Sequence, residues 1–130
     1  MPKTPRPTGA ELAILQVLWE HGPATVRQVH ETIAKRAGDR ATGYTTTLKL
    51  MQIMAEKGLV LRNEDQRAHV YEARAPQDQT QKQLVRDLVD RAFNGSALNL
   101  VMQALSARKA TRAELAQIRK LLDEYERGAR

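Results

Sequence analysis

The sequence predicts a mainly α-helical fold with one small β-hairpin, and three observations support this class. Only 4% of the 130 residues are aromatic and only 7 are glycine, which is unusual for a β-sandwich or a barrel. Apolar residues recur at helical spacing along most of the chain. Residues 59–73 differ, because two short strand-like runs there flank a polar, turn-prone segment.

The first two predicted helices each begin with a capping box, in which an N-cap Thr is followed three residues later by Glu or Gln. Thr8 and Glu11 open the first helix, which ends near the His-Gly-Pro break at residues 21–23. Its expected apolar face comprises Leu12, Leu15, Leu18 and Trp19. Thr25 and Gln28 open the second, shorter helix, and the segment between the two helices leaves room for only a token strand. The second apolar face comprises Val26, Val29 and Ile33.

The third predicted helix starts near Tyr44 and stops before Gly58. The residues expected to face the core at i, i+3, i+4 and i+7 are Thr47, Leu50, Met51 and Met54. The outer face is therefore led by Thr45, Thr46 and Lys49. Two strands follow, at residues 59–62 and 68–73, and the polar tip between them lacks an Asn-Gly or Asp-Gly pair, so we expect a longer tip.

Beyond Pro76 every pattern is helical, which divides the chain into a domain at residues 1–75 and a three-helix domain at residues 76–130. Short helices with long apolar stripes cannot bury them alone, so a partner chain is the simplest cover and homodimerisation is expected. The residues predicted to form the dimer interface are Leu84, Leu88, Phe93, Leu98, Val101, Met102, Leu105, Leu115, Ile118, Leu121, Leu122 and Tyr125.

Charge and composition narrow the function. A net charge of +6 and a pI near 10.0 favour a polyanionic partner. The absence of cysteine excludes disulfides, thiolate metal sites and cysteine nucleophiles. Neither a His cluster with metal-ligand spacing nor a Gly-rich phosphate loop is present, so we expect no enzyme, no metal and no cofactor. No apolar stretch approaches the roughly 20 residues of a membrane span, and the first residues lack the apolar core of a signal peptide, so the cytoplasm is the expected location.

A helix, a Gly-Pro break, a short capped helix, a polar turn, a Thr/Lys-led helix and a hairpin follow in the order of a winged helix-turn-helix. Short hydroxyl side chains at a helix N-terminus suit phosphate or base edges, and a lysine suits guanine or phosphate. The predicted DNA-binding residues are Tyr44, Thr45, Thr46, Lys49, Gln52, Arg62 and Arg67. Three alternatives stay open: the threonines only cap the helix, the two arginines are only solvated, and Tyr44 packs against the helix.

Several runs together resemble the BlaI/MecI family of penicillinase and methicillin-resistance repressors, over nearly the whole chain. They are Leu12 to Trp19, the stretch Gly-Pro-Ala-Thr-Val-Arg-Gln-Val at 22–29, Tyr-Thr-Thr at 44–46, Lys-Gly-Leu-Val at 57–60, Ala-His-Val-Tyr at 68–71, Phe-Asn-Gly-Ser at 93–96, and Leu100-Val101. The resemblance implies a homodimeric winged-helix repressor that binds a palindromic double-stranded operator. In relatives that operator controls β-lactamase genes and often the gene of the repressor itself.

The departures from the family affect the mechanism. Relatives commonly carry Thr at the position of Lys49 and Arg at the position of Ile53, so the resemblance does not transfer a base preference, and one phosphate contact of relatives is missing. In some relatives a sensor protease cuts an Asn-Phe bond in the first dimerisation helix. The corresponding residues here are Gln103-Ala104, which leaves a sensor protease or another antirepressor open as a partner. Copper-responsive relatives use C-terminal cysteine pairs, which this chain lacks.

The alternative function is a protein-interaction module, in which the winged helix docks another protein. Such a docking face should be apolar. The outer face of the third helix offers only Leu48 and Ile53 among Thr, Lys, Gln and Glu, which favours DNA.

Overall fold

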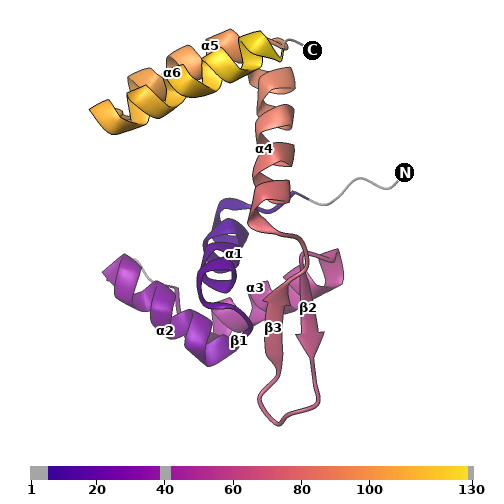
Figure 1. The fold of residues 1–130 in the computed structure, drawn as a ribbon. Helices are drawn as coiled ribbons and strands as arrows, with labels where there is room; N and C mark the ends of the chain where they lie inside the picture. Colours follow the sequence, from indigo (N-terminus) through magenta and orange to yellow (C-terminus); the bar gives the residue numbers. More distant parts are fainter. Residues whose placement is uncertain (1–5, 39–41, 129–130) are drawn as a thin grey trace. The chain divides into compact units, whose positions relative to one another are not determined.

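The computed structural model describes residues 6–38 and 42–128, which form two compact units, Met1–Leu84 and Val85–Arg130. The first unit contains α1 (Gly9–His21), β1 (Ala24–Thr25), α2 (Val26–Ala37), α3 (Tyr44–Lys57), β2 (Val60–Asn63) and β3 (Val70–Ala73) (Figure 1). The helix α4 (Gln77–Ala92) crosses from the first unit into the second, which also holds α5 (Ala97–Ala107) and α6 (Arg112–Arg127). The boundary between these two compact units falls within α4, and the domain division at residues 75 and 76 stays a prediction from the sequence.

The predicted caps form as the sequence indicated. The Thr8 N–H donates to Glu11 Oε1 at 2.9 Å, and the Glu11 N–H donates to Thr8 Oγ1 at 3.2 Å. Thr25 and Gln28 make the same reciprocal pair at the start of α2, and α6 begins with another capping box. Each box satisfies two backbone donors that a helix start otherwise leaves unpaired. These short-range bonds explain why the helix starts could be located from sequence.

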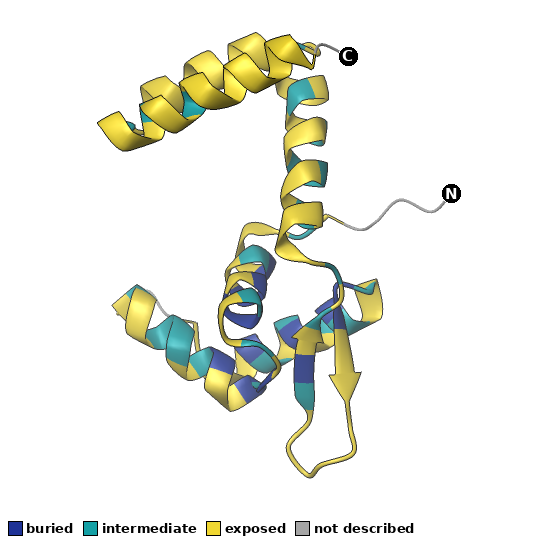
Figure 2. Ribbon diagram, in the orientation of Figure 1, coloured by how far each residue is buried: buried dark blue, intermediate teal, exposed yellow. Residues whose placement is uncertain are grey.

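The core of the first unit lies where α1, α2 and α3 pack around a three-stranded antiparallel sheet in the order β1-β3-β2. The short strand β1 pairs with β3, with Ala24 opposite Tyr71 and Thr25 opposite Val70. Tyr71 also lies opposite Arg62 of β2 and is itself 1% exposed. Figure 2 shows the buried residues gathered in this unit. Its buried apolar residues are Ile14, Leu15, Val17, Leu18, Ala24, Val26, Val29, Met51, Met54, Leu59, Val60 and Tyr71.

The predicted apolar face of α1 was partly wrong. Leu12 and Trp19 are only partly buried, whereas Ile14 and Val17 are buried. The helix contacts α2, α3 and β3 at once, so its buried surface is wider than a single stripe. Trp19 instead packs at the edge of the core and donates its indole N–H to the Ala75 carbonyl at 2.9 Å.

One acidic side chain is part of this core. Glu11 is 1% exposed, and its carboxylate accepts hydrogen bonds from Lys57 Nζ at 3.0 and 2.9 Å. The bridge joins the first turn of α1 to the last residue of α3. Burial raises the pKa of the Glu11 carboxyl, but the Thr8 amide and the Lys57 ammonium outweigh burial, so its pKa lies below the ordinary value.

Gly58 joins α3 to the sheet. It adopts a left-handed conformation, with φ 85° and ψ 17°, and its N–H bonds to the Ala55 carbonyl at 3.2 Å. The next residue, Leu59, donates to the Met54 carbonyl at 2.9 Å and accepts from the Arg74 N–H at 3.1 Å. A side chain at position 58 would be strained by this φ, so the glycine is required here.

The second unit exposes its apolar stripes. None of its described residues, 85–128, is buried, and α5 and α6 make few contacts with one another. Of the residues predicted to dimerise, eight are exposed: Leu88, Leu98, Val101, Met102, Leu105, Leu121, Leu122 and Tyr125. Leu84, Phe93, Leu115 and Ile118 are partly buried. Exposed apolar stripes of this extent are typical of interaction surfaces, and the homodimer stays a prediction.

Candidate nucleic-acid interface

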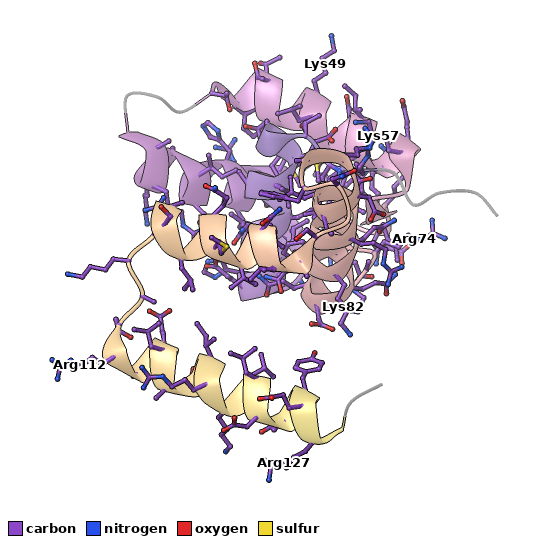
Figure 3. All side chains as sticks on the ribbon, turned by 90° about the horizontal axis from the view of Figure 1, so that it is seen from above. Lys49, Lys57, Arg74, Lys82, Arg112 and Arg127 are labelled. Carbon is purple, nitrogen blue, oxygen red and sulfur yellow. The ribbon has the colours of Figure 1, made fainter. Side chains whose placement is uncertain are left out.

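The outer face of α3 presents the polar side chains that the sequence placed there. Thr45, Thr46, Lys49 and Gln52 are exposed, and Tyr44 is 41% exposed. Of the four residues expected to face the core, Thr47, Met51 and Met54 are each at most 1% exposed, whereas Leu50 is partly buried against the core. Figure 3 shows Lys49 projecting outward from the helix. The helical periodicity thus orients this face correctly, while contact of its residues with DNA stays a prediction.

The first turn of α3 has free backbone donors. Gly43 is the N-cap, and among the described residues no side chain caps this helix, so the threonines do not serve as its caps. The first intrahelical bond runs from the Thr47 N–H to the Gly43 carbonyl at 3.1 Å, which leaves the amides of Tyr44, Thr45 and Thr46 without a helical acceptor. Unpaired N–H groups and the positive end of the helix dipole both favour a phosphate.

Thr47 has a different role from its two neighbours. Its hydroxyl donates to the Gly43 carbonyl at 3.3 Å and lies 3.4 Å from Thr42 Oγ1 and 3.5 Å from His30 Nδ1. It therefore ties the start of α3 to α2 from inside the protein. It is a positioning residue and is not available to a ligand.

Tyr44 lies between two residues of α2 that the sequence did not single out. The Arg27 Cζ lies 5.5 Å from the centre of the Tyr44 ring, and the His30 ring meets it edge-on, with centroids 5.8 Å apart and planes at 86°. The ring thus packs across the helix pair rather than against its own helix. No local pattern marks Arg27, because its partner lies 17 positions further along the chain.

The hairpin of β2, β3 and the residues between them, which we call the wing, carries two arginines with different partners. Arg62 pairs with Glu64, with Nε and Oε2 3.1 Å apart. Hydrogen bonding to Tyr71 and the charge of Glu64 raise the pKa of Arg62 above its ordinary value. Arg67 is exposed near the tip and, among the described residues, has no carboxylate partner. Arg67 is therefore the freer of the two predicted phosphate ligands, whereas the charge of Arg62 is partly satisfied within the wing.

The other cations of the first unit also differ in whether they have a carboxylate partner. Lys57 is bound to the buried Glu11, and Arg36 pairs with Glu20 on the surface. Within the described part of the chain, Lys49 and Arg27 have no carboxylate partner. Lys49, Arg27 and Arg67 are thus three of the cations that have no carboxylate partner among the described residues, and they belong to α3, to the start of α2 and to the wing.

Three helices around a three-stranded antiparallel sheet, with an exposed third helix and a charged hairpin, define a winged-helix domain. The chain belongs to the penicillinase repressor family, whose model matches residues 7–124. This confirms the family that the sequence motifs indicated, and membership in a repressor family agrees with the expectation that the chain is not an enzyme. None of the helices in the described part of the chain is long and apolar enough to cross a membrane.

Individual proteins support the same family. The transcriptional regulator BlaI of Mycobacterium tuberculosis is 43% identical over 72 residues, which are 55% of this chain and 50% of that protein. The penicillinase repressor of Bacillus licheniformis is 21% identical over 126 residues, 96% of this chain and 95% of that protein. The chain spans about half the length of the BlaI relatives that it matches.

A solved structure supports the fold. The solution structure of the DNA-binding domain of the repressor BlaI matches 59% of this chain and 90% of its own, with a TM-score of 0.50 and 22% sequence identity. The predicted fold class, mainly helical with a winged helix-turn-helix, is therefore confirmed for the first unit.

Proposed function

We propose that this protein is a transcriptional repressor that binds a palindromic operator in double-stranded DNA as a homodimer. The observation that carries the proposal is the outer face of α3, which combines exposed Thr45, Thr46, Lys49 and Gln52 with first-turn amides that have no acceptor within the helix. The family name points the same way. Binding to the chromosome would place the protein in the cytoplasm.

In the proposed complex α3 lies in the major groove. Lys49 can donate to the O6 and N7 acceptors of guanine, and Gln52, nearly one turn further on, can pair with the N6 and N7 of adenine. Thr45 and Thr46 lie on the first turn, where hydroxyls and backbone amides together suit a phosphate. The start of the helix thus sets the register on the backbone, and its middle supplies the contacts to bases.

The wing supplies a second backbone contact. Arg67, at the tip, is the side chain free to neutralise a phosphate beside the groove. Arg62, paired with Glu64, mainly stiffens the hairpin that carries Arg67. Both were predicted as DNA contacts, and the proposal assigns the larger share to Arg67.

The exposed stripes of the second unit are the basis for the homodimer. Burial of a leucine side chain contributes roughly 1.5–3 kcal/mol, and three exposed leucines, Leu98, Leu121 and Leu122, are among the residues that a second copy would cover. A two-fold dimer presents two α3 helices, so its operator should be palindromic with half-sites about one DNA turn, or a multiple of it, apart.

The proposal for the target genes rests only on family membership. We propose that the operator controls β-lactamase or related cell-envelope-stress genes, because relatives carry the name penicillinase repressor. Lys49 and Ile53 lie on the helix that reads DNA and differ from the residues common in the family, so the operator sequence is expected to be this protein's own. A footprint on the DNA flanking its gene would report the site and the half-site spacing together.

Fluorescence titration against that flanking DNA and against a random-sequence duplex tests the proposal. The expected result is tighter, salt-sensitive binding to the flanking DNA. If Lys49 reads a base, Lys49→Ala should lose about 1–3 kcal/mol and relax specificity at one position. A matched control is Lys82→Ala, an exposed lysine of α4 paired with Asp78, which should change little. Binding that is insensitive to salt and equal on both duplexes would refute the repressor function.

The alternative, a protein-docking module, has less support in the structure. Leu48 and Ile53 were the two apolar residues on the outer face of α3, but both are partly buried and Leu48 packs against the core. The exposed remainder of that face is polar, which suits DNA better than an apolar partner surface.

A further inference from the structure

We propose that Arg27 is a phosphate ligand of the DNA interface and that Tyr44 acts by holding it there. This inference rests on the proposed DNA-binding function and adds to it a residue outside α3 and the wing. It also changes the role of Tyr44 from a direct contact to a positioning residue.

The contact between the two side chains is the first support. The Arg27 Cζ lies 5.5 Å from the Tyr44 ring centre, within the range of a cation–π interaction. The ring also packs against His30 of α2, which meets it edge-on with the ring centroids 5.8 Å apart. A flexible arginine is thereby held beside the first residue of α3.

The second support is that the Arg27 guanidinium is not paired with the nearby carboxylate of Glu31. Glu31 lies one helical turn along α2, at the spacing of a surface ion pair, yet within the described chain Arg27 forms no salt bridge with it or with any other carboxylate. The guanidinium charge is therefore not neutralised. Its side chain is exposed, so an external anion can reach it.

The chemistry of the guanidinium completes the argument. A cation placed over a ring engages its charge with the π face and consumes none of its five N–H donors. Those donors form a planar fork that matches two phosphate oxygens. An arginine restrained in this way loses less side-chain entropy on binding than a free one, which favours a defined backbone contact.

Salt-dependent titration of the full chain on a random-sequence duplex tests the proposal, because a phosphate contact needs no operator. We expect Arg27→Gln to reduce the slope of log K against log salt by about 0.9 for each protomer bound, and to weaken binding about eightfold per protomer at 0.1 M salt. The loss should be the same on the flanking DNA of the gene. Lys35→Gln, which removes another exposed α2 cation without a carboxylate partner, is the matched control and should leave the slope unchanged.

Two variants of Tyr44 separate the holding role from a direct contact. Tyr44→Phe keeps the ring and removes the hydroxyl, so it should bind as the wild type does. Tyr44→Leu removes the ring face and should reproduce part of the Arg27→Gln loss. In the double variant the two losses should not add, because one residue acts through the other. Circular dichroism on each variant confirms that α2 and α3 are intact.

The outcomes are distinct. An unchanged slope for Arg27→Gln would overturn the role of Arg27 while DNA binding itself stands. A Tyr44→Phe loss equal to that of Tyr44→Leu, or additive losses in the double variant, would overturn the holding role of Tyr44. If the wild-type chain shows no salt-dependent binding to either duplex, the proposed function fails first, and the role of Arg27 fails with it.

Discussion

Replacing Lys57 with methionine should destabilise the first unit by leaving a buried carboxylate without its cation. Glu11 is 1% exposed and receives two bonds from Lys57, at 3.0 and 2.9 Å. At this separation the attraction is about 6 kcal/mol at an effective dielectric constant near 20. The Lys57 side chain retains 35% exposure, so solvent screens part of that attraction. Because removal of one partner of a buried pair costs about 3–5 kcal/mol, we expect about 3 kcal/mol for Lys57→Met.

Urea unfolding followed by tryptophan fluorescence measures this loss. Trp19 is the only tryptophan and lies in the first unit, so its emission reports that unit. With a denaturant slope of about 1 kcal/mol/M, the unfolding midpoint should fall by about 3 M, or the variant should be unfolded without urea. Lys35→Met, at an exposed lysine of α2, should change stability by less than about 0.5 kcal/mol.

The pH dependence gives a second test of the same bridge. The pKa of Glu11 is lowered in the folded state, so its contribution is present above the ordinary carboxyl pKa and is lost as the pH falls through the folded pKa. The destabilisation by Lys57→Met should therefore be largest near pH 7 and shrink below about pH 4. Adding Glu11→Gln to Lys57→Met should recover stability at pH 7, because it removes the unpaired charge. A cost below about 1 kcal/mol, or no recovery in the double variant, would refute the reasoning.

Two further predictions concern the core and the dimer. Met51→Ala should lower the free energy of unfolding by about 2–5 kcal/mol, because it leaves a cavity in the core. Met102→Ala, at a residue that is 58% exposed, should leave the unfolding curve measured by Trp19 fluorescence unchanged. Similar curves for both variants would contradict the assignment of Met51 to the core. Leu122→Lys should weaken self-association by at least about tenfold in analytical ultracentrifugation, because it places a charge where a 57% exposed leucine is proposed to be covered. Unchanged association would exclude this face as the interface.

The parts of the fold that the sequence predicted are those governed by short-range chemistry. The predicted capping boxes at Thr8 and Thr25 each involve residues three positions apart, and both form. The start, the end and the outer face of α3 follow from its periodicity and from Gly58. These features need no knowledge of distant packing, because a helix of known phase fixes which side chains share a face.

The parts that the sequence missed depend on residues far apart in the chain. The burial of Glu11 follows from Lys57, which lies 46 positions away. The expected face of α1 was too narrow because three elements pack on that helix, and one periodic stripe describes only one neighbour. Arg27 was quoted only within the family motif at 22–29 and was not predicted as a contact, since its contact with Tyr44 exists only once α2 and α3 have packed. At the candidate site, the sequence thus located α3 and its exposed face but not the residues of α2 that pack against it.

The turn at Gly58 is expected to hold α3 and the wing at a nearly constant separation. A single left-handed residue joins them, with hydrogen bonds on both sides, so we expect their separation to vary little. In the proposed complex the DNA must then adapt to the span between Lys49 and Arg67. Duplexes that bend or narrow their grooves at low cost should be preferred, even at base pairs that no side chain touches. Part of the operator preference of this protein is therefore expected to reside in the stiffness of the DNA.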